Sequence, residues 1–496
     1  MAALHEPEDR RAVVALGAVS VALLAVRLYA ATHVGFGDSE ALYASYALHP
    51  QPAYLDHPGL VGTAARLVGG GSSPSPLAAH LVTSVLATAF PWIVALACRA
   101  AGAPWRRSLV AALLVAVAPE IAVGLFALTP DLLLAVAWSA TLACAAVGLR
   151  SAPGTGRAAL AFAAAGLLAG VSAASKVTGL ALFAVLPIAY AAPGARQHAR
   201  TVAPWAGLAA GALVVAPVLA FEAHAGWPML RHRLLDGQPD PGFSLRNIGA
   251  LVGGQLAYLS PLVAVLVVLA ARQAWRDRGD TVGRLLLAAF LVPLAVLVPL
   301  CAWSRVAEPH WIAPALLALA PAAARAAVAP SRRLVIATVA TAGAMVVAAH
   351  AWVLTPGALR LAPASYDARL DLSNELRGWP EVVDAVRQIA SLPPGAEPGD
   401  VVVAGPHWVI CAQLEAALRD ELRVGCDTPV PDDFDTWWPR TRWRTADYVV
   451  WVSDARFDPP ALPSHAPVFS HEVRIVRDGR TVRVLTVTLL ARRAQA

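Results

Sequence analysis

Long apolar blocks alternate with short polar segments through the first 354 residues of the chain. A helix needs roughly 17 to 25 apolar residues to cross the roughly 30 Å of a bilayer's hydrocarbon. Eleven blocks approach or reach this length, and each predicts a transmembrane helix: 12–34, 77–97, 109–128, 132–149, 158–174, 177–192, 202–221, 248–270, 285–303, 311–327 and 334–354.

Residues 355–496 follow a different pattern, with ordinary polarity and short β-branched runs at 401–403, 448–452 and 481–490. Such runs are typical of strands. The sequence therefore predicts an α-helical polytopic membrane protein with about eleven spans in residues 1–354, followed by a soluble α/β domain in residues 355–496.

Composition supports this class, since 57% of the residues are hydrophobic and only 15% are charged. The first apolar block, about 23 residues long, exceeds the roughly 7 to 15 residues of a signal-peptide core, so we expect it to remain as a span. The net charge of +6 comes from arginines dispersed over many loops. Nucleic-acid binding would favour a basic stripe instead, so we expect no nucleic-acid partner.

The basic residues also predict the orientation, because Lys and Arg in short loops stay on the cytoplasmic side. With the N-terminus inside, sixteen basic residues fall in the N-terminal tail and inner loops and six in the outer loops. We therefore expect a multi-pass protein of the plasma (inner) membrane, with a cytoplasmic N-terminus and an extracytoplasmic C-terminal domain.

In this topology, acids, bases and cations gather at the outer face. The first outer loop, 35–76, contains Asp38, Glu40, Asp56 and His57 within GDSEALYASYALHPQPAYLDHPGLVG. Later outer turns and loops add five further candidates: Asp131, Lys176, Arg231, Arg233 and His310.

Eight segments in order resemble one known family: DSEALY, YLDHPGL, TPD, SKVTGL, AHAGWP, GGQLAYLSP, PHWIAPA and LRGWPEV. The family is the bacterial branch of the dolichyl-phosphate-mannose protein mannosyltransferase-like enzymes, glycosyltransferase family 39. The chain is also similar to the lipid A aminoarabinose transferases. The family usually has Asp-Glu directly joined and Asp-His-Pro-Pro, whereas this chain has Asp38-Ser39-Glu40 and ends its second motif in Gly59. Both Asp38 and Glu40 therefore remain candidates for the catalytic carboxylate.

The resemblance implies a GT-C fold, in which the first outer loop covers a cavity shared by a lipid-linked donor and an acceptor. The reaction would transfer a hexose or pentose from a polyprenyl-phosphate carrier to a hydroxyl of a lipid, protein or glycan, with inversion. A carboxylate must accept the proton of the attacking hydroxyl, and Asp38 or Glu40 is the candidate. Fixed cations stabilise the charge that grows on the leaving phosphate. Lys176, Arg231 and Arg233 are candidates for that role, together with His57 or His310.

Each of these residues also has a structural alternative. Asp131 could be an ordinary helix N-cap, and Lys176 could form an ion pair with Asp131 or Glu120 that only joins helices. Arg231 and Arg233 could contact lipid headgroups. Arg27 lies inside the first apolar block, where a charge is costly, so it should pair with an acid of the first loop or extend to the outer surface.

Three further expectations follow from the residue types. A divalent metal ion could bind if Asp38, Glu40, Asp56, His57 and His310 converge. Cys411 and Cys426, the only cysteines of the exported domain, should form a disulfide. The main alternative function is transport or flipping of lipid-linked saccharides, but we see no pair of related halves of the kind found in many transporters. The identity of the sugar and of the acceptor cannot be read from these patterns.

Overall fold

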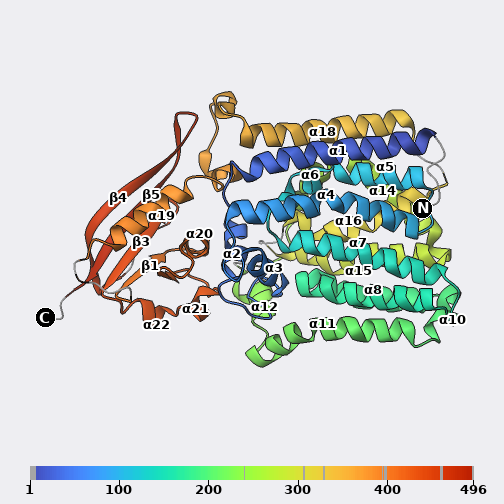
Figure 1. The fold of residues 1–496 in the computed structure, drawn as a ribbon, viewed down its shortest axis with the longest axis horizontal. Coiled ribbons are helices and arrows are strands. Elements are labelled where there is room, and N and C mark those ends of the chain that lie inside the picture. Colours follow the sequence, from blue (N-terminus) through green and yellow to red (C-terminus); the bar gives the residue numbers. More distant parts are fainter. Residues whose placement is uncertain are drawn as a thin grey trace.

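The computed structural model describes residues 7–238, 241–304, 308–327, 330–393, 395, 399–457 and 462–493. Figure 1 shows a helical bundle with a sheet-containing domain at one end and the N-terminus at the other. In the described residues, seven helices are long and apolar enough to cross a membrane, as expected of a multi-pass membrane protein. These are α1 (Pro7–Ala31), α4 (Pro76–Ala100), α7 (Pro130–Arg150), α8 (Gly156–Ser175), α11 (Ala203–Ala225), α15 (Thr281–Trp303) and α18 (Arg332–Leu354).

Three further apolar segments are bent helix pairs, and together with the long helices they give up to ten spans in the described part. They are α5 (Trp105–Ala116) with α6 (Pro119–Ala122) and η1 (Gly124–Phe126), η2 (Val177–Ala181) and α9 (Leu182–Tyr190) with η3 (Pro193–Ala195) and α10 (Arg196–Ala199), and α13 (Leu245–Leu259) with α14 (Pro261–Arg276) and η5 (Asp277–Gly279). The bends measure 74°, 82° and 107°. In each pair the second limb begins with a proline, which lacks the N–H needed to continue the first limb.

The count differs from the predicted eleven at block 311–327. There the chain forms η6 (Pro309–Ile312), α16 (Ala313–Leu317) and α17 (Leu319–Arg325), which are too short to cross a bilayer singly. Pro314 and Pro321 lie in this block and each removes a backbone donor. Apolar composition alone did not reveal this interruption.

Small residues allow α8 and α11 to approach closely. A Cβ on Gly166 would lie 1.9 Å from the carbonyl oxygen of Gly207, and one on Gly170 would lie 2.3 Å from that of Gly211. Gly166 and Gly170 of α8 are four residues apart, and so are Gly207 and Gly211 of α11. The two glycines of each helix therefore lie on the same face. Within lipid the hydrophobic effect does not drive helices together, so close backbone packing of this kind stabilises their association.

Short elements at one end of the bundle separate it from the C-terminal domain (Figure 1). They include α2 (Asp38–Ser45), α3 (Leu60–Val68), α12 (Pro228–Arg231) and the π-helical turn η4 (His232–Asp236). Helices α2 and α3 belong to the predicted first outer loop. Their buried side chains, among them Leu42, Tyr43 and Val61, form one hydrophobic core with Ile410 and Val450 of the C-terminal domain.

The C-terminal domain contains a five-stranded mixed sheet in the order β2-β1-β3-β5-β4. After three short 3₁₀ turns, η7 (Ala358–Leu361), η8 (Ala368–Leu370) and η9 (Leu372–Asn374), its elements are α19 (Trp379–Ala390), β1 (Val401–Gly405), α20 (Trp408–Leu418), β2 (Arg423–Cys426), α21 (Phe434–Trp437), α22 (Arg440–Trp443), β3 (Tyr448–Asp454), β4 (His465–Arg477) and β5 (Arg480–Arg492). Strand β1 pairs in parallel with β2 and β3, whereas β3, β5 and β4 pair antiparallel. The α/β character predicted for this domain is confirmed.

The predicted disulfide of this domain is not formed. Cys411 and Cys426 are both buried free thiols. The Cys411 thiol lies 3.6 Å from the carbonyl oxygen of Gly405, and the Cys426 thiol lies 3.0 Å from the hydroxyl of Thr428. Each sulfur therefore has a polar partner in a closed core, and the residue types alone did not reveal these contacts.

Candidate functional site

A tight hairpin in the first loop presents Asp56 and His57. The Tyr54 N–H donates to the carbonyl oxygen of His57 at 2.9 Å, and the Gly59 N–H donates to that of Pro52 at 2.8 Å. A Cβ on Gly59 would lie only 2.2 Å from the carbonyl oxygen of Gln51. The hairpin therefore excludes a larger residue at the position where this chain departs from the family's second proline.

Asp56 lies against two basic side chains of η4. Its Oδ1 is 2.9 Å from Nη2 of Arg233 and 3.8 Å from Nε2 of His232. The Arg233 guanidinium also lies 5.6 Å from the ring centre of Trp311, in a cation–π arrangement. The hairpin, η4 and η6 thus meet at the end of the bundle that faces the C-terminal domain.

Lys176 and Asp131 form a second ion pair beside the first. The Lys176 Nζ is 2.7 Å from Asp131 Oδ1, and Nε2 of His310 is 4.0 Å from Asp131 Oδ2. Lys176 ends α8 with its side chain only 8% exposed, whereas that of Asp131 is 27% exposed. Asp131 occupies the first turn of α7, whose N-cap is Thr129, so the N-cap alternative is wrong. The structural alternative for Lys176, an ion pair with Asp131, is present.

His57 and His310 complete the group as neutral imidazoles. Burial, followed by the nearby charges of Lys176, Arg233 and His310, holds the pKa of His57 well below its ordinary value. Burial and the charge of Lys176 lower the pKa of His310 to about 4, against the opposing charge of Asp131. At neutral pH the fixed cations of the group are therefore Lys176 and Arg233, and the histidines supply hydrogen-bonding groups rather than charge.

Glu40 is occupied by contacts within the protein. Its Oε1 accepts from the Leu128 N–H at 2.7 Å and lies 3.0 Å from Nε2 of His80, while its Oε2 accepts from the Gly37 N–H at 3.0 Å. Both carboxylate oxygens thus have short-range partners in a buried environment. This pattern ties the start of α2 to the turn that precedes α7.

Asp38 faces the C-terminal domain rather than the ion pairs. Its Oδ1 accepts from Nε2 of Gln413 at 3.2 Å, and its N–H donates to Oε2 of Glu375 at 3.4 Å. Burial raises the pKa of Asp38 against the opposing charges of Arg483 and Arg456. Burial and the charge of Asp38 raise the pKa of Glu375 to about 7.

No local pattern predicted these partners of Asp38, because they lie more than 330 residues away along the chain. Glu375, Arg456 and Arg483 line a polar cavity of about 250 Å³ on the C-terminal domain. The only sequence signal near them was the LRGWPEV segment of the family resemblance. This segment begins at Leu376, directly after Glu375.

Two predicted binding residues lie outside the group. Arg27 is 1% exposed and donates to Thr88 Oγ1 at 3.1 Å and to the carbonyl oxygens of Ile121 and Ala122 at 2.8 and 3.0 Å. Carbonyl groups at the end of a helix have no partner within the helix. Arg27 therefore pairs with such carbonyls at the end of the short helix α6, and not with an acid of the first loop. The Arg231 side chain is 64% exposed and lies 4.0 Å from Asp236.

The five residues considered for a metal ion do not converge. Asp56, His57 and His310 lie in or beside the group, whereas Asp38 and Glu40 are held elsewhere by the contacts above. Among the described residues, no three His, Cys, Asp or Glu side chains are arranged to hold a metal ion.

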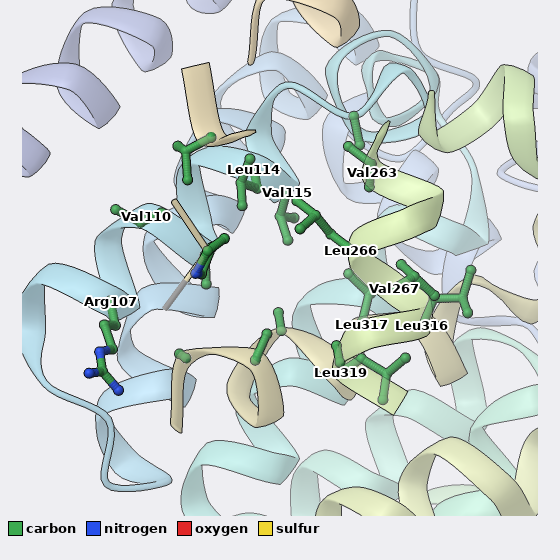
Figure 2. A pocket seen from close by; sticks show the side chains of 18 of the residues that line it. Arg107, Val110, Leu114, Val115, Val263, Leu266, Val267, Leu316, Leu317 and Leu319 are labelled. Atoms are coloured by element: carbon green, nitrogen blue, oxygen red, sulfur yellow. The ribbon is translucent and has the colours of Figure 1, made fainter. Parts of the chain in front are cut away.

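An apolar cavity of about 650 Å³ lies between α5, α14, α16, α17 and the start of α18. Figure 2 shows side chains of the first four of these helices around it. Its walls include Val110, Leu114, Val263, Leu266 and Leu317. Four arginines line the part near the N-terminal end of the bundle: Arg99, Arg106, Arg107 and Arg332. Beyond the end of α5 it reaches Glu120, which is close enough to Asp131 and Lys176 for their charges to act on its carboxyl group.

No family model and no curated protein matches the chain by sequence. Its structure is similar to that of ArnT from Cupriavidus metallidurans bound to undecaprenyl phosphate, with a TM-score of 0.63 and 16% identity, over 96% of this chain and 97% of that one. The apo form of the same protein gives a TM-score of 0.62 at 15% identity, over 95% and 97% of the two chains.

The archaeal oligosaccharyltransferase AglB from Archaeoglobus fulgidus, in complex with an inhibitory peptide and a dolichol-phosphate, gives a TM-score of 0.51 at 12% identity, over 89% of this chain and 69% of that one. The chain therefore has the GT-C fold that the sequence resemblance implied.

Proposed function

We propose that this protein is a membrane glycosyltransferase that moves a sugar from a polyprenyl-phosphate carrier to an acceptor hydroxyl. The observation that carries the proposal is the pairing of Asp56 with Arg233 and of Asp131 with Lys176 at one end of a GT-C fold. This places two fixed cations and two carboxylates within one partly enclosed group. Such a group can both bind a phosphate and accept a proton.

The donor fits this group through both its phosphate and its tail. Lys176 and Arg233 would contact the carrier phosphate and stabilise the charge that grows on it as the sugar leaves. The apolar cavity beside Glu120 offers space for an isoprenoid tail. The similar structures contain undecaprenyl phosphate or a dolichol-phosphate, which are carriers of the same chemical class.

Asp56 is the first-loop carboxylate that we assign as the general base. Its side chain is 25% exposed and lies with the cations, whereas Asp38 and Glu40 are buried in other contacts. Asp56 would take the proton of the acceptor hydroxyl as the oxygen attacks the anomeric carbon. Because a single displacement replaces the phosphate directly, the anomeric configuration would invert.

We further propose that the reaction takes place on the extracytoplasmic face of the plasma (inner) membrane. The basic loops favour a cytoplasmic N-terminus. Arg233, which pairs with Asp56, lies in η4 directly after α12. Figure 1 shows α12 at the end of the bundle away from the N-terminus, on the side of the C-terminal domain. Cysteine labelling in intact cells should reach residue 400 and not residue 157. If residue 157 is labelled and residue 400 is not, the protein has the opposite orientation in the membrane.

A transfer assay tests the function directly. Purified protein given a polyprenyl-phosphate sugar and envelope acceptors should release polyprenyl phosphate. Asp56→Asn should lower turnover by at least roughly 10²-fold, because an amide cannot accept the proton. Movement of the intact lipid-linked sugar across a vesicle, without cleavage of its phosphate bond, would support a transporter instead. If Asp56→Asn keeps full turnover and Asp38→Asn loses it, the general base is Asp38 of α2 and not Asp56.

A further inference from the structure

Asp433 of the C-terminal domain contacts the hairpin that carries Asp56. Its Oδ1 accepts from the N–H of Leu55, the residue before Asp56, at 3.0 Å, and its Oδ2 accepts from the Tyr46 hydroxyl at 3.1 Å. Asp433 is 8% exposed. One buried carboxyl group therefore bridges α2 and the hairpin from a position 378 residues further along the chain.

Aromatic packing makes this bridge rigid. The rings of Tyr46 and Tyr54 stack with their centres 3.6 Å apart at 6°, and the Tyr54 hydroxyl donates to the carbonyl oxygen of His49 at 2.8 Å. Trp437, which lies in α21 next to Asp433, stacks on His49 at 4.2 Å. The hairpin thus packs between the residues that follow α2 and the aromatic side chain of α21, and Asp433 hydrogen-bonds both to the hairpin and to Tyr46.

A second contact fixes the same surface a short distance away. His49 Nε2 lies 2.6 Å from Oε1 of Glu415 in α20. The core shared by α2, α3 and the C-terminal domain continues beneath these polar contacts. The hairpin therefore takes its position from the C-terminal domain as well as from the membrane helices that supply Lys176 and Asp131.

We propose that Asp433 is a positioning residue for the donor site, and that the C-terminal domain serves to hold the Asp56–His57 hairpin in register with the cations of the helical bundle. This inference rests on the proposed function, because it assigns Asp56 and His57 to that site. Asp433 itself touches no reacting group. It acts through the backbone of Leu55, so its removal would let Asp56 move relative to Arg233.

The test compares Asp433→Ala, Asp433→Asn and the matched control Asp435→Ala in the full-length protein. Asp435 lies in the first turn of α21, which Asp433 precedes as N-cap, and it pairs with Arg440 at 2.8 Å. A displacement of about 1 Å in a catalytic group can cost roughly 10²-fold in rate. We therefore expect Asp433→Ala to lower kcat for sugar transfer by about 10- to 100-fold.

The two other variants refine this expectation. Asp433→Asn keeps a carbonyl oxygen for the Leu55 N–H, so it should recover most of the lost kcat. Asp435→Ala should change the melting temperature more than kcat. If Asp433→Ala and Asp435→Ala lower kcat equally, in proportion to their loss of stability, the positioning role is wrong.

Hydrogen exchange gives a readout that does not depend on activity. In Asp433→Ala, peptides covering residues 51–59 should exchange faster, while peptides from β1 and β3 keep the wild-type protection. Unchanged exchange at residues 51–59 would overturn the inference. If the wild-type protein transfers no sugar but the hairpin still loosens in Asp433→Ala, the proposed function fails while the structural link stands.

Discussion

The two halves of the first loop use their acids in opposite ways. In α2, Asp38 and Glu40 are buried, and protein groups occupy Asp38 Oδ1 and both oxygens of Glu40. In the hairpin, Asp56 is partly exposed and its nearest partners are cationic side chains. Acids of the same loop can thus differ in whether they have spare capacity for a substrate, and the two that the sequence pointed to as catalytic candidates, Asp38 and Glu40, have the less of it. Available lone pairs, and not charge alone, distinguish a base from a structural carboxylate.

The largest effect on stability should come from Glu40→Ala. This change leaves the Leu128 and Gly37 N–H groups without their acceptor in a buried site, at a cost of roughly 1 to 3 kcal/mol each. We expect a clear drop in melting temperature in detergent, together with poor recovery of folded protein. Folded Glu40→Ala with a wild-type melting temperature and no turnover would instead assign Glu40 to the chemistry.

Lys176→Ala should weaken donor binding next. A hydrogen bond to a charged group contributes roughly 1.5 to 3 kcal/mol, which corresponds to about 10- to 100-fold in the KM for the polyprenyl-phosphate sugar. Lys176→Arg should lose less, since it keeps the charge but changes its shape. Asp131→Asn is the matched control, because it breaks the same ion pair and leaves the lysine in place. If Lys176→Ala only lowers the melting temperature and donor kinetics stay normal, the ion pair is structural.

The Asp38–Glu375 contact should make stability depend on pH. The pKa of Glu375 is raised to about 7, from an ordinary value near ~4.3. Its contribution to stability is therefore fully present below about pH 4 and is lost as the pH rises through about 7. The melting temperature of the wild type, relative to Glu375→Gln, should fall between pH 5 and pH 8. Parallel curves for the two proteins would mean that Glu375 ionises as it does in the unfolded chain.

The cysteines should show the smallest effect. Both Cys411 and Cys426 are free thiols in the closed core of the C-terminal domain. After unfolding without reductant, mass spectrometry should find both thiols alkylated, and reductant should leave the melting temperature unchanged. A disulfide-linked peptide pair would instead support the disulfide predicted from the sequence.

The sequence predicted the parts of the fold that have a local periodic pattern. Ten of the eleven apolar blocks correspond to long helices or bent pairs in the described residues. The β-branched runs at 401–403, 448–452 and 481–490 lie in β1, β3 and β5. Strand β4 was missed because polar and charged residues interrupt its apolar ones, and its side chains at positions 467–472 are all exposed, so no continuous apolar run marks it.

The candidate site was predictable only in part. The Asp131–Lys176 contact could be anticipated, since Asp131 lies where α7 begins and Lys176 follows the end of the neighbouring helix α8. The roles of Asp38 and Glu40 could not, because their partners are Gln413, Glu375, His80 and a backbone amide at Leu128. Contacts over such distances depend on how the domains pack, and no pattern near residue 38 encodes them.

The core shared by the first loop and the C-terminal domain has a consequence for biosynthesis. Leu55 and Asp433 are 378 residues apart, so at about 5 to 20 residues per second the ribosome needs roughly 20 to 75 seconds to make the second after the first. Throughout that interval the apolar side chains of α2 and α3 lack their final neighbours. Chains released before residue 433 should insert their helices normally, yet be cut by protease within residues 35–76. Folding of the first loop would therefore be completed only after the last part of the chain has been made.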